Sequence, residues 1–507
     1  MMVKLTNAEA LQHVTIHVSS SLQQSVEADA VIAIATKAEW LNGTMNVPGS
    51  AICKQSIETG VIKAQAGSVH VFPAGEGNVR FLIAIVRSEH GWTTEELRCA
   101  FAKAAREAIR LKAAHPAIFV SHEFAVITPE KRTAAVAQAV VEGSLLGAYQ
   151  RETYKKEAEA LHHLQSIELF GAVLDHEQWK AGAERGHAYA IGTTIARDLT
   201  NLPGNELYPS TLADIAARIA DTYKLEIEVL DEIQLEAKGM GGIIGVGKAS
   251  VNPPRLIVLK YQGKEEWTDV LGLVGKGITF DTGGISLKRA DGMEEMICDM
   301  GGSATVLGTM ATIGRLRPKK NVICVIASAE NMPGGNALKP GDIVKTYSGR
   351  TIEVINTDAE GRVVLSDAMT YAKELGASKL IDVATLTGAA IVAFGDVTTA
   401  AVTNDEPLLN EVLAASMRAG EHVWALPSHK EYWDLLKSDV ADVRNSCGRG
   451  GGTITGGLFI GTFADGLPWV HLDIAGTAYL KKSRGVNPKG ATGVMVRTLA
   501  ETIYPYV

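Results

Sequence analysis

The chain has 507 residues and a formal net charge of −8, with 57 acidic side chains and 49 basic ones. This acidic balance argues against nucleic acid or an anionic membrane as the main partner, because both require a basic surface. With 46% hydrophobic and 21% charged residues, the composition is that of a globular protein, and the length suggests two to four domains.

The first third of the chain alternates short apolar runs with helical periodicity. The runs that fit strands are residues 31–36, 81–86 and 117–121. Leucine, alanine and phenylalanine recur at helical spacing in residues 94–114, and residues 153–200, rich in Glu, Lys and Ala, are also helical in pattern. We therefore expect a smaller N-terminal α/β domain over residues 1–165 and connecting helices over residues 166–200.

Beyond residue 200, apolar strands alternate with helices. The expected strands are residues 225–230, 255–261, 270–274, 322–327 and 380–383. This pattern is typical of an α/β domain with a mostly parallel central sheet, which binds ligands at the carboxyl ends of its strands. Only 13 of the 51 glycines lie in residues 1–200, and glycine permits tight turns and close approach to a bound group. We expect residues 201–507 to form the domain that carries the chemistry.

No segment indicates export or insertion into a membrane. The start of the chain lacks the charged and apolar regions of a secretory signal. The longest apolar stretch, residues 380–394, contains Asp382 and is too short to span a bilayer. The five cysteines are scattered and form no CxxC pair, which argues against a disulfide framework and a zinc knuckle. We expect a cytoplasmic protein without a membrane partner.

One glycine-rich segment imitates a phosphate-binding loop. Gly242, Gly247 and Lys248 have the spacing of such a loop, but Ala249 stands where a Ser or Thr would hold Mg²⁺. The residues before the segment look helical, whereas this loop normally follows a strand. We interpret the segment as a structural turn and not as a nucleotide site.

Acidic and basic side chains recur beside glycines in residues 274–362. They are Lys276, Asp281 and Lys288 after an apolar strand, Asp299 before a glycine pair, and Asp358, Glu360 and Arg362 at alternate positions. In an extended segment, a period of two places the last three side chains on one side. Because a helix is expected over residues 363–372, Arg362 would lie near a helix N-terminus.

These residue types favour metal chemistry. Four carboxylates in a partly buried site are costly unless cations neutralise them. Two divalent ions that share carboxylates would form a hydrolytic centre, in which Lys288 and Arg362 supply positive charge for a developing oxyanion. Each residue also fits a structural role, since an Asp before Thr-Gly-Gly is commonly a turn former. The residues alone leave both readings open.

The same segments closely resemble the leucyl aminopeptidase family, which are cytosolic two-metal exopeptidases. The resemblance lies in VGKGITFDTGGISLK at residues 274–288, MEEMICDMGG at 293–302, NTDAEGR at 356–362, DVATLTGA at 382–389 and HLDIAGTA at 471–478. It covers roughly residues 185–507, whereas residues 1–165 match only in length and α/β pattern. The resemblance implies a two-domain α/β fold and a metal-dependent aminopeptidase.

The resemblance also implies a set of metal ligands. These would be Lys276, Asp281, Asp299, Asp358 and Glu360. Asp281 and Glu360 would bridge two divalent ions, Mn²⁺ or Zn²⁺, with Mg²⁺ as an alternative at one site. One ion would add Asp358 through its side chain and main-chain oxygen, and the other would add Lys276 and Asp299. A lysine ligand must be neutral, and a nearby dication favours that state by lowering the lysine pKa.

Lys288 and Arg362 correspond to the family's catalytic pair. Arg362 would hold a bicarbonate ion that acts as the general base, which suits the two-pronged arginine side chain. Lys288 would stabilise the oxygen of the gem-diolate. The free α-amine of the substrate would bind one ion and its carbonyl oxygen the other, so that only peptides and amides with a free N-terminus react.

Four residues would shape the pocket for the first side chain of the substrate. They are Met296, Thr385, Leu386 and Gly388. A flexible methionine favours leucine-like groups without strict selection. Gly456 and Gly457 stand where relatives carry bulkier small residues, which predicts a wider pocket or a looser helix. Asp382 and Asp473 lie in family motifs and are interpreted as structural.

The family further implies a homo-oligomer, expected to be a hexamer. Two alternative functions remain open. A dipeptidase that cleaves cysteinylglycine would use the same centre. Some relatives bind DNA, which the net charge of −8 disfavours, although a hexamer could present a local basic groove.

Overall fold

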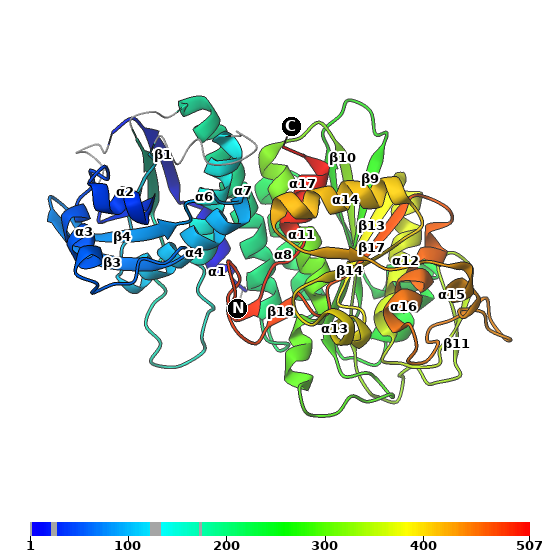
Figure 1. Cartoon of the computed structure of the whole chain (residues 1–507). Coiled ribbons are helices and arrows are strands. Elements are labelled where there is room, and N and C mark those ends of the chain that lie inside the picture. Colours follow the sequence, from blue (N-terminus) through cyan, green and yellow to red (C-terminus); the bar gives the residue numbers. More distant parts are fainter. Residues whose placement is uncertain (1–2, 22–27, 122–132, 172–174, 507) are drawn as a thin grey trace.

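The computed structural model describes residues 3–21, 28–121, 133–171 and 175–506 and shows two α/β domains on either side of a long helix (Figure 1). The N-terminal domain contains a six-stranded sheet of order β1-β6-β5-β2-β4-β3. Its strands are β1 (Thr15–Ser19), β2 (Ala30–Thr36), β3 (Val69–Glu76), β4 (Val79–Arg87), β5 (Pro116–Phe119) and β6 (Ser166–Phe170). Neighbouring strands pair in parallel except β3, which runs antiparallel to β4.

Helices cover both faces of this sheet. Ile32 and Ile34 of β2 share an apolar cluster with α4 and α6, whereas Val31 and Ala33 share one with α2 and α3. The helices are α2 (Lys37–Asn42), α3 (Ser50–Glu58), α4 (Thr94–Arg110) and α6 (Thr133–Gly147), with α1 (Thr6–Gln12) before β1. The alternation follows from the period of two along an apolar strand, and it makes β2 a central, fully buried strand.

The boundary region differs from the sequence prediction. Residues 151–160 are exposed and form no helix, because they offer no apolar face that could pack on the domain. Residues 166–170, expected to begin the connecting helices, form β6 and pair with β1 and β5. The N-terminal sheet therefore extends beyond residue 165, and the connection itself is α7 (His176–Asn201).

The second domain contains an eight-stranded sheet of order β15-β14-β17-β13-β9-β10-β8-β7. The strands are β7 (Glu226–Leu230), β8 (Arg255–Gln262), β9 (Val270–Asp281), β10 (Asn321–Asn331), β13 (Ala377–Ala384), β14 (Thr399–Thr403), β15 (Val423–Ala425) and β17 (Trp469–Asp473). The central strands β10, β9, β13 and β17 run parallel, while β7, β8 and β14 add antiparallel pairs. The predicted mostly parallel α/β fold is confirmed, although β14, β15 and β17 were not anticipated.

Two layers of helices enclose this sheet. One layer contains α8 (Pro209–Tyr223), α11 (Gly301–Leu316) and α17 (Val496–Ile503), and the other contains α10 (Gly241–Gly247), α12 (Glu360–Glu374) and α16 (Gly452–Gly461). The remaining helices include α9 (Glu232–Lys238), α13 (Gly388–Phe394), α14 (Glu406–Ala419) and α15 (Lys430–Asp434), and a small sheet joins β11 (Ile343–Lys345), β12 (Thr351–Glu353) and β16 (Val443–Arg444). The hairpin β18 (Tyr479–Leu480) and β19 (Gly490–Ala491) precedes α17.

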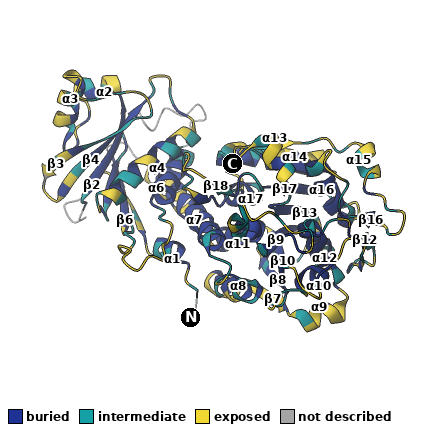
Figure 2. Ribbon diagram, turned by 90° about the horizontal axis from the view of Figure 1, so that it is seen from below, coloured by how far each residue is buried: buried dark blue, intermediate teal, exposed yellow. Residues whose placement is uncertain are grey.

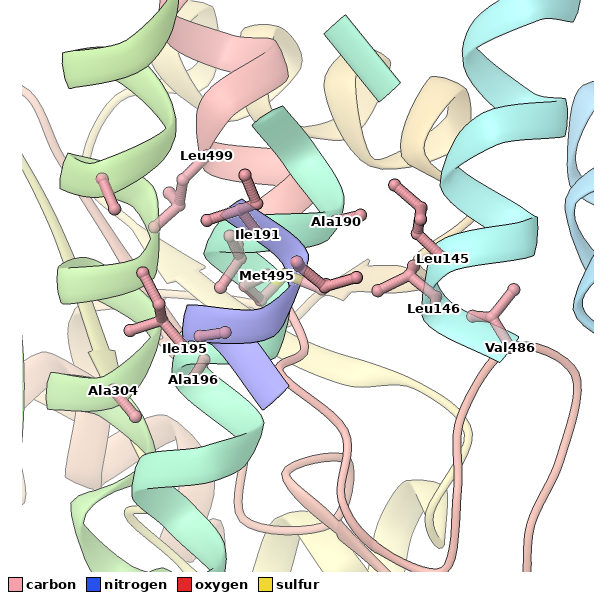
Figure 3. Packing of buried hydrophobic residues seen from close by; sticks show 14 of the residues in the cluster. Leu145, Leu146, Ala190, Ile191, Ile195, Ala196, Ala304, Val486, Met495 and Leu499 are labelled. Atoms are coloured by element: carbon pink, nitrogen blue, oxygen red, sulfur yellow. The ribbon is translucent and has the colours of Figure 1, made fainter. Parts of the chain in front are cut away.

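The α7 helix belongs to the cores of both domains. It packs between α6 and α11, and buried residues run along its whole inner length (Figure 2). In Figure 3, Leu145 of α6, Ile191 and Ile195 of α7, and Leu499 of α17 lie in one group of apolar side chains. A single apolar cluster therefore continues from the N-terminal sheet into the second domain.

Buried ion pairs join the domains beside this core. Glu142 of α6 is fully buried, and its Oε1 lies 2.8 Å from Arg98 Nε and 3.1 Å from Arg497 Nη1. Arg497 belongs to α17, so the contact crosses from the first domain to the second, where its Nη2 also faces Glu421 at 3.4 Å. Among the described residues, no helix is long and apolar enough to cross a membrane.

Candidate metal and peptide site

The predicted charged residues meet at the carboxyl ends of the parallel strands. Lys276 and Asp281 come from β9, and Asp299 comes from the 3-10 helix η1 (Met293–Met300). Asp358 lies in the turn before α12, and Glu360 is the first residue of that helix. The edge of the sheet is the place where an α/β domain binds its ligand.

A bulge in β9 makes this arrangement possible. Asp281 is five positions after Lys276, an odd spacing that would place the two side chains on opposite faces of a regular strand. The register with β10 shifts between Ala329 and Glu330, and Thr279 has no partner of its own. Lys276 and Asp281 consequently pair with Ala327 and Asn331, which are four residues apart on β10 and share a face.

The carboxylates lie close together. Asp281, Asp358 and Glu360 each offer an oxygen, and these three oxygens lie within 4.8 Å of one another. Asp299 joins them through Lys276, whose Nζ lies 2.8 Å from Asp299 Oδ2 and 2.8 Å from Glu360 Oε1. All four predicted acidic ligands are thus brought into one cluster.

Lys288 lies on the other side of the cluster. Its Nζ is 2.8 Å from Asp281 Oδ2 and 2.5 Å from Asp358 Oδ1. The turn between Asp281 and Lys288 contains Gly283, whose φ is +86° and whose missing Cβ would lie 2.8 Å from Asp358 Oδ1. Only glycine permits both the conformation and the close approach.

Burial is the largest influence on the pKa values of the clustered side chains. Asp281, Asp299 and Glu360 are at most 5% exposed. Burial raises the pKa of Asp299, Glu360 and Asp358, and the charge on Asp281 raises these pKa values further. Burial alone would lower the pKa of Lys276, but the surrounding carboxylates outweigh it and raise the pKa.

The donor set fits divalent cations. Four carboxylates face two lysines, so the ionised cluster carries more negative charge than the lysines neutralise. Buried carboxylates without sufficient positive charge are costly, and oxygen ligands at this spacing are the ones that Mn²⁺, Mg²⁺ and Zn²⁺ accept. The residues present therefore fit a metal centre.

Arg362 lies in the first turn of α12, which begins three residues earlier than predicted. Residues 358–362 are consequently not one extended segment, as the alternating pattern suggested, because Glu360 already starts the helix. A Glu at this position is favoured by the helix dipole. Arg362 is buried and donates from Nη1 to the carbonyl oxygen of Asn445 at 2.9 Å. Within the described residues its buried Nε has no hydrogen-bond partner, which leaves donor capacity for an anion.

The four predicted pocket residues differ in burial, and one of them contacts the acidic cluster. Thr385 is buried and donates from Oγ1 to Asp299 Oδ1 at 2.8 Å, and its carbonyl oxygen accepts from Lys276 Nζ at 2.9 Å. Met296 and Leu386 are half-buried, and Gly388 is exposed at the start of α13. Thr385 thus contacts the acidic cluster directly.

Two aspartates expected to be structural have complete sets of partners. Asp473 Oδ1 accepts from the backbone N–H groups of Leu386 and Thr387, and its Oδ2 accepts from Thr387 Oγ1. Asp382 accepts from Trp469 Nε1 and from His471 Nδ1 in the buried sheet. Asp473 therefore fixes the loop that carries Leu386.

Gly456 and Gly457 allow α16 to pack closely. A Cβ on Gly456 would lie 3.0 Å from Thr387 Cγ2 and 3.1 Å from Arg362 Nη2, and one on Gly457 would lie 2.9 Å from Val402 Cβ. Both glycines lie inside α16, which is continuous from Gly452 to Gly461. The close contacts account for their lack of side chains, and the helix shows no break at either residue.

The glycine-rich segment that imitates a phosphate loop forms α10. The backbone N–H of Ile243 donates to Asp367 Oδ2 at 2.9 Å, so a carboxylate of the protein itself lies at the start of this helix. The interpretation of residues 242–249 as a structural element agrees with this contact.

Sequence reasoning missed two asparagines of the site. Asn331 donates a hydrogen bond to the carboxylate of Asp281. Asn445 donates from its side-chain amide to the carbonyl oxygens of Asn356 and Ala359, and so holds the two ends of the turn before α12 together. The strand containing Asn331 was predicted to end at residue 327, although β10 continues to Asn331. A longer predicted strand would have placed Asn331 at the ligand-binding edge, whereas Asn445 carries no comparable signal.

Comparisons with known proteins agree with this geometry. Residues 194–500 match the catalytic domain of the cytosol aminopeptidase family, and residues 49–158 match the N-terminal domain of the same family. A probable cytosol aminopeptidase of Alkaliphilus metalliredigens is 44% identical over 466 residues, covering 90% of this chain and 92% of the relative. One of Bacillus subtilis is 45% identical over 451 residues, covering 88% and 89%. Among solved structures, the bottromycin maturation enzyme BotP in complex with Mn aligns with a TM-score of 0.82 and 35% identity, covering 94% of this chain and 99% of that one.

Proposed function

The chain belongs to the cytosol aminopeptidase family, and we propose that it is a two-metal exopeptidase that removes leucine-like N-terminal residues, with broad tolerance, from peptides and amino-acid amides. The family makes it an aminopeptidase, a hydrolase that acts on peptides. The observation that carries the finer proposal is the buried cluster of four carboxylates and two lysines at the carboxyl ends of the sheet.

In this proposal Lys276, Asp281, Asp299, Asp358 and Glu360 hold two divalent cations, Mn²⁺ or Zn²⁺, with Mg²⁺ as an alternative at one site. When bound, the cations supply a Lewis acid for the scissile carbonyl, an acidified water and a position for the free α-amine. The complex with Mn that is described for BotP supports this choice of metal.

The basic residues contribute charge and proton transfer. Lys288 lies between Asp281 and Asp358, where its ammonium group can stabilise negative charge that develops on the substrate oxygen. Arg362, with a buried Nε that has no hydrogen-bond partner in the described structure, holds a bicarbonate ion as general base. The guanidinium group suits an oxyanion because it donates from two nitrogens in one plane.

The substrate's first side chain would lie beside Met296, Thr385, Leu386 and Gly388. Met296 and Leu386 are apolar and half-buried, which favours aliphatic groups, and the flexibility of methionine allows several of them. We further propose a homo-hexamer that acts in the cytoplasm. The cytosolic name of its relatives and the five free cysteines support that location.

Leucine amide hydrolysis by chelator-treated protein restored with Mn²⁺ or Zn²⁺ tests the proposal. We expect Asp358→Ala and Lys288→Ala to lose most turnover, while Lys339→Ala, which removes an exposed ion pair with Asp342, stays near wild type. Wild-type turnover in either site variant would refute the assignment. Comparing leucine amide with cysteinylglycine measures the substrate preference.

A further inference from the structure

A buried asparagine lies directly behind the acidic cluster. Asn331 is the last residue of β10 and is 4% exposed. Its Nδ2 donates to Asp281 Oδ1 at 2.8 Å and to the carbonyl oxygen of Thr357 at 3.0 Å. One amide group therefore connects the end of β9 to the residue that precedes Asp358.

The backbone around Asn331 holds it in this position. Its carbonyl oxygen accepts from the N–H of Thr282 at 3.0 Å and from Thr282 Oγ1 at 2.8 Å. The bulge at Thr279 places Asn331 opposite Asp281, whereas a regular register would pair it with Phe280 one residue earlier. The same bulge that turns Asp281 toward the site thus brings the asparagine to it.

The two carboxylate oxygens of Asp281 have different partners. Oδ1 accepts from the N–H of Gly283 at 2.8 Å as well as from Asn331, so both of its lone pairs are used. Oδ2 faces Lys288 and the rest of the cluster. Two donors on one oxygen fix the orientation of the carboxylate, and a fixed ligand loses less conformational entropy when it binds.

We propose that Asn331 is a positioning residue of the metal centre, which orients Asp281 and the turn carrying Asp358 for cation binding. The proposal rests on the proposed function, since it assumes that these carboxylates are metal ligands. Residues that orient ligands commonly contribute a factor of about 10 to 100 in metal affinity, and we expect Asn331→Ala to lose affinity in that range.

The same strand offers a matched control. Asn321 begins β10, is 1% exposed, and donates from Nδ2 to the carbonyl oxygens of Glu266 and Thr268 at 2.6 and 2.9 Å. Asn321→Ala removes an equally buried amide with a comparable number of hydrogen bonds at the opposite end of the strand. It should lower stability without changing the metal site.

The experiment is calorimetric titration of Mn²⁺ into the full-length, chelator-treated protein. We expect the Kd of Asn331→Ala to rise about 10- to 100-fold, and that of Asn321→Ala to stay within about twofold of wild type. Equal Kd values for Asn331→Ala and wild type, or an equal rise in both variants, would overturn the inference. If wild type itself bound neither Mn²⁺ nor Zn²⁺, the proposed function would fail instead.

A second variant tests the same inference if Asn331→Ala does not fold. Asn331→Ser retains a polar group that is too short to reach Asp281, and it leaves a smaller void. It should show the same direction of change in the Kd for Mn²⁺. Wild-type affinity in folded Asn331→Ser would also overturn the inference.

Discussion

Lys276 lies directly against the backbone of Gly361. A Cβ atom at Gly361 would come within 2.6 Å of Lys276 Cε and 2.8 Å of its Nζ. The lysine therefore reaches Asp299 and Glu360 only because the second residue of α12 has no side chain. This contact couples the start of the helix to the position of a proposed metal ligand.

Gly361→Ala should consequently impair catalysis without unfolding the protein. Alanine is a better helix former than glycine by about 1 kcal/mol, so the helix itself tolerates the change, while Lys276 must move. Displacement of a site group by about 1 Å can cost about 100-fold in rate. We expect a loss of that order in kcat/KM for leucine amide. Gly335→Ala, where a Cβ would meet no atom within 4 Å, is the control, and equal rates for the two variants would contradict the prediction.

Arg362→Ala should remove the response to bicarbonate. Loss of a donor to a developing or bound anion commonly costs about 10² to 10³ in kcat, and we expect a fall in that range with a smaller change in KM. Rates measured in bicarbonate-depleted and bicarbonate-supplemented buffer should differ for wild type and coincide for the variant. Arg350→Ala, which breaks a partly exposed pair with Asp465, should respond as wild type does. Stimulation of Arg362→Ala by bicarbonate would argue for another anion site.

Asp367 should make stability depend on pH. Burial raises its pKa from 3.8 to about 7, although backbone N–H groups of Tyr347, Ile243 and Gly242 oppose the rise. The folded protein then holds a proton that the unfolded chain releases, so this contribution to stability is full below pH 3.8 and is lost as the pH rises toward 7. The loss amounts to at most about 4 kcal/mol.

Asp367→Asn should remove that contribution, because asparagine does not titrate. Urea unfolding at pH 4, 5.5 and 7 measures the difference between variant and wild type. We expect the variant to gain stability relative to wild type as the pH rises. A difference that stays constant across this range would show that Asp367 keeps an ordinary pKa.

Glu142→Gln should destabilise the junction of the domains. Removing the charge takes away the carboxylate that Arg98 and Arg497 share. Glu95 and Glu421 stay beside them, so we expect a loss smaller than the roughly 3 to 5 kcal/mol of a fully broken buried pair. Thermal unfolding should show a lower Tm than wild type. Glu159→Gln, which removes an exposed pair with Lys112, should change stability by less than about 1 kcal/mol. Similar Tm values for both variants would mean that Arg98 and Arg497 find other partners.

The charged residues of the site could be predicted because acidic and basic side chains recur beside glycines in short motifs of residues 274–362. Their convergence followed from the rule that parallel strands present their carboxyl ends at one edge. The bulge at Thr279 could not be predicted, since it depends on the pairing of β9 with β10 and not on local sequence. Asn331 was missed because the predicted strand ended at residue 327, four residues short of it, and its contact with Asp281 depends on the same bulge.

The N-terminal region was less predictable. The strand pattern of residues 31–36 reflects a fully buried strand, and β2 matches it closely. Residues 153–165 have the composition of a helix, but helical propensity is weak without an apolar face to bury. The exposed side chains of residues 151–160 show that the tertiary structure offers them no such partner.

The apolar cluster that runs through α7 has a consequence for dissection of the chain. Cutting between α6 and α7 would uncover the apolar side chains that meet there, among them Leu145 and Leu146 of α6 and Ala190 of α7 (Figure 3). Neither half would keep a water-excluding surface at the cut, and exposed patches of this kind promote aggregation. The catalytic half is therefore not an independent module, and heat should melt both domains in one cooperative transition.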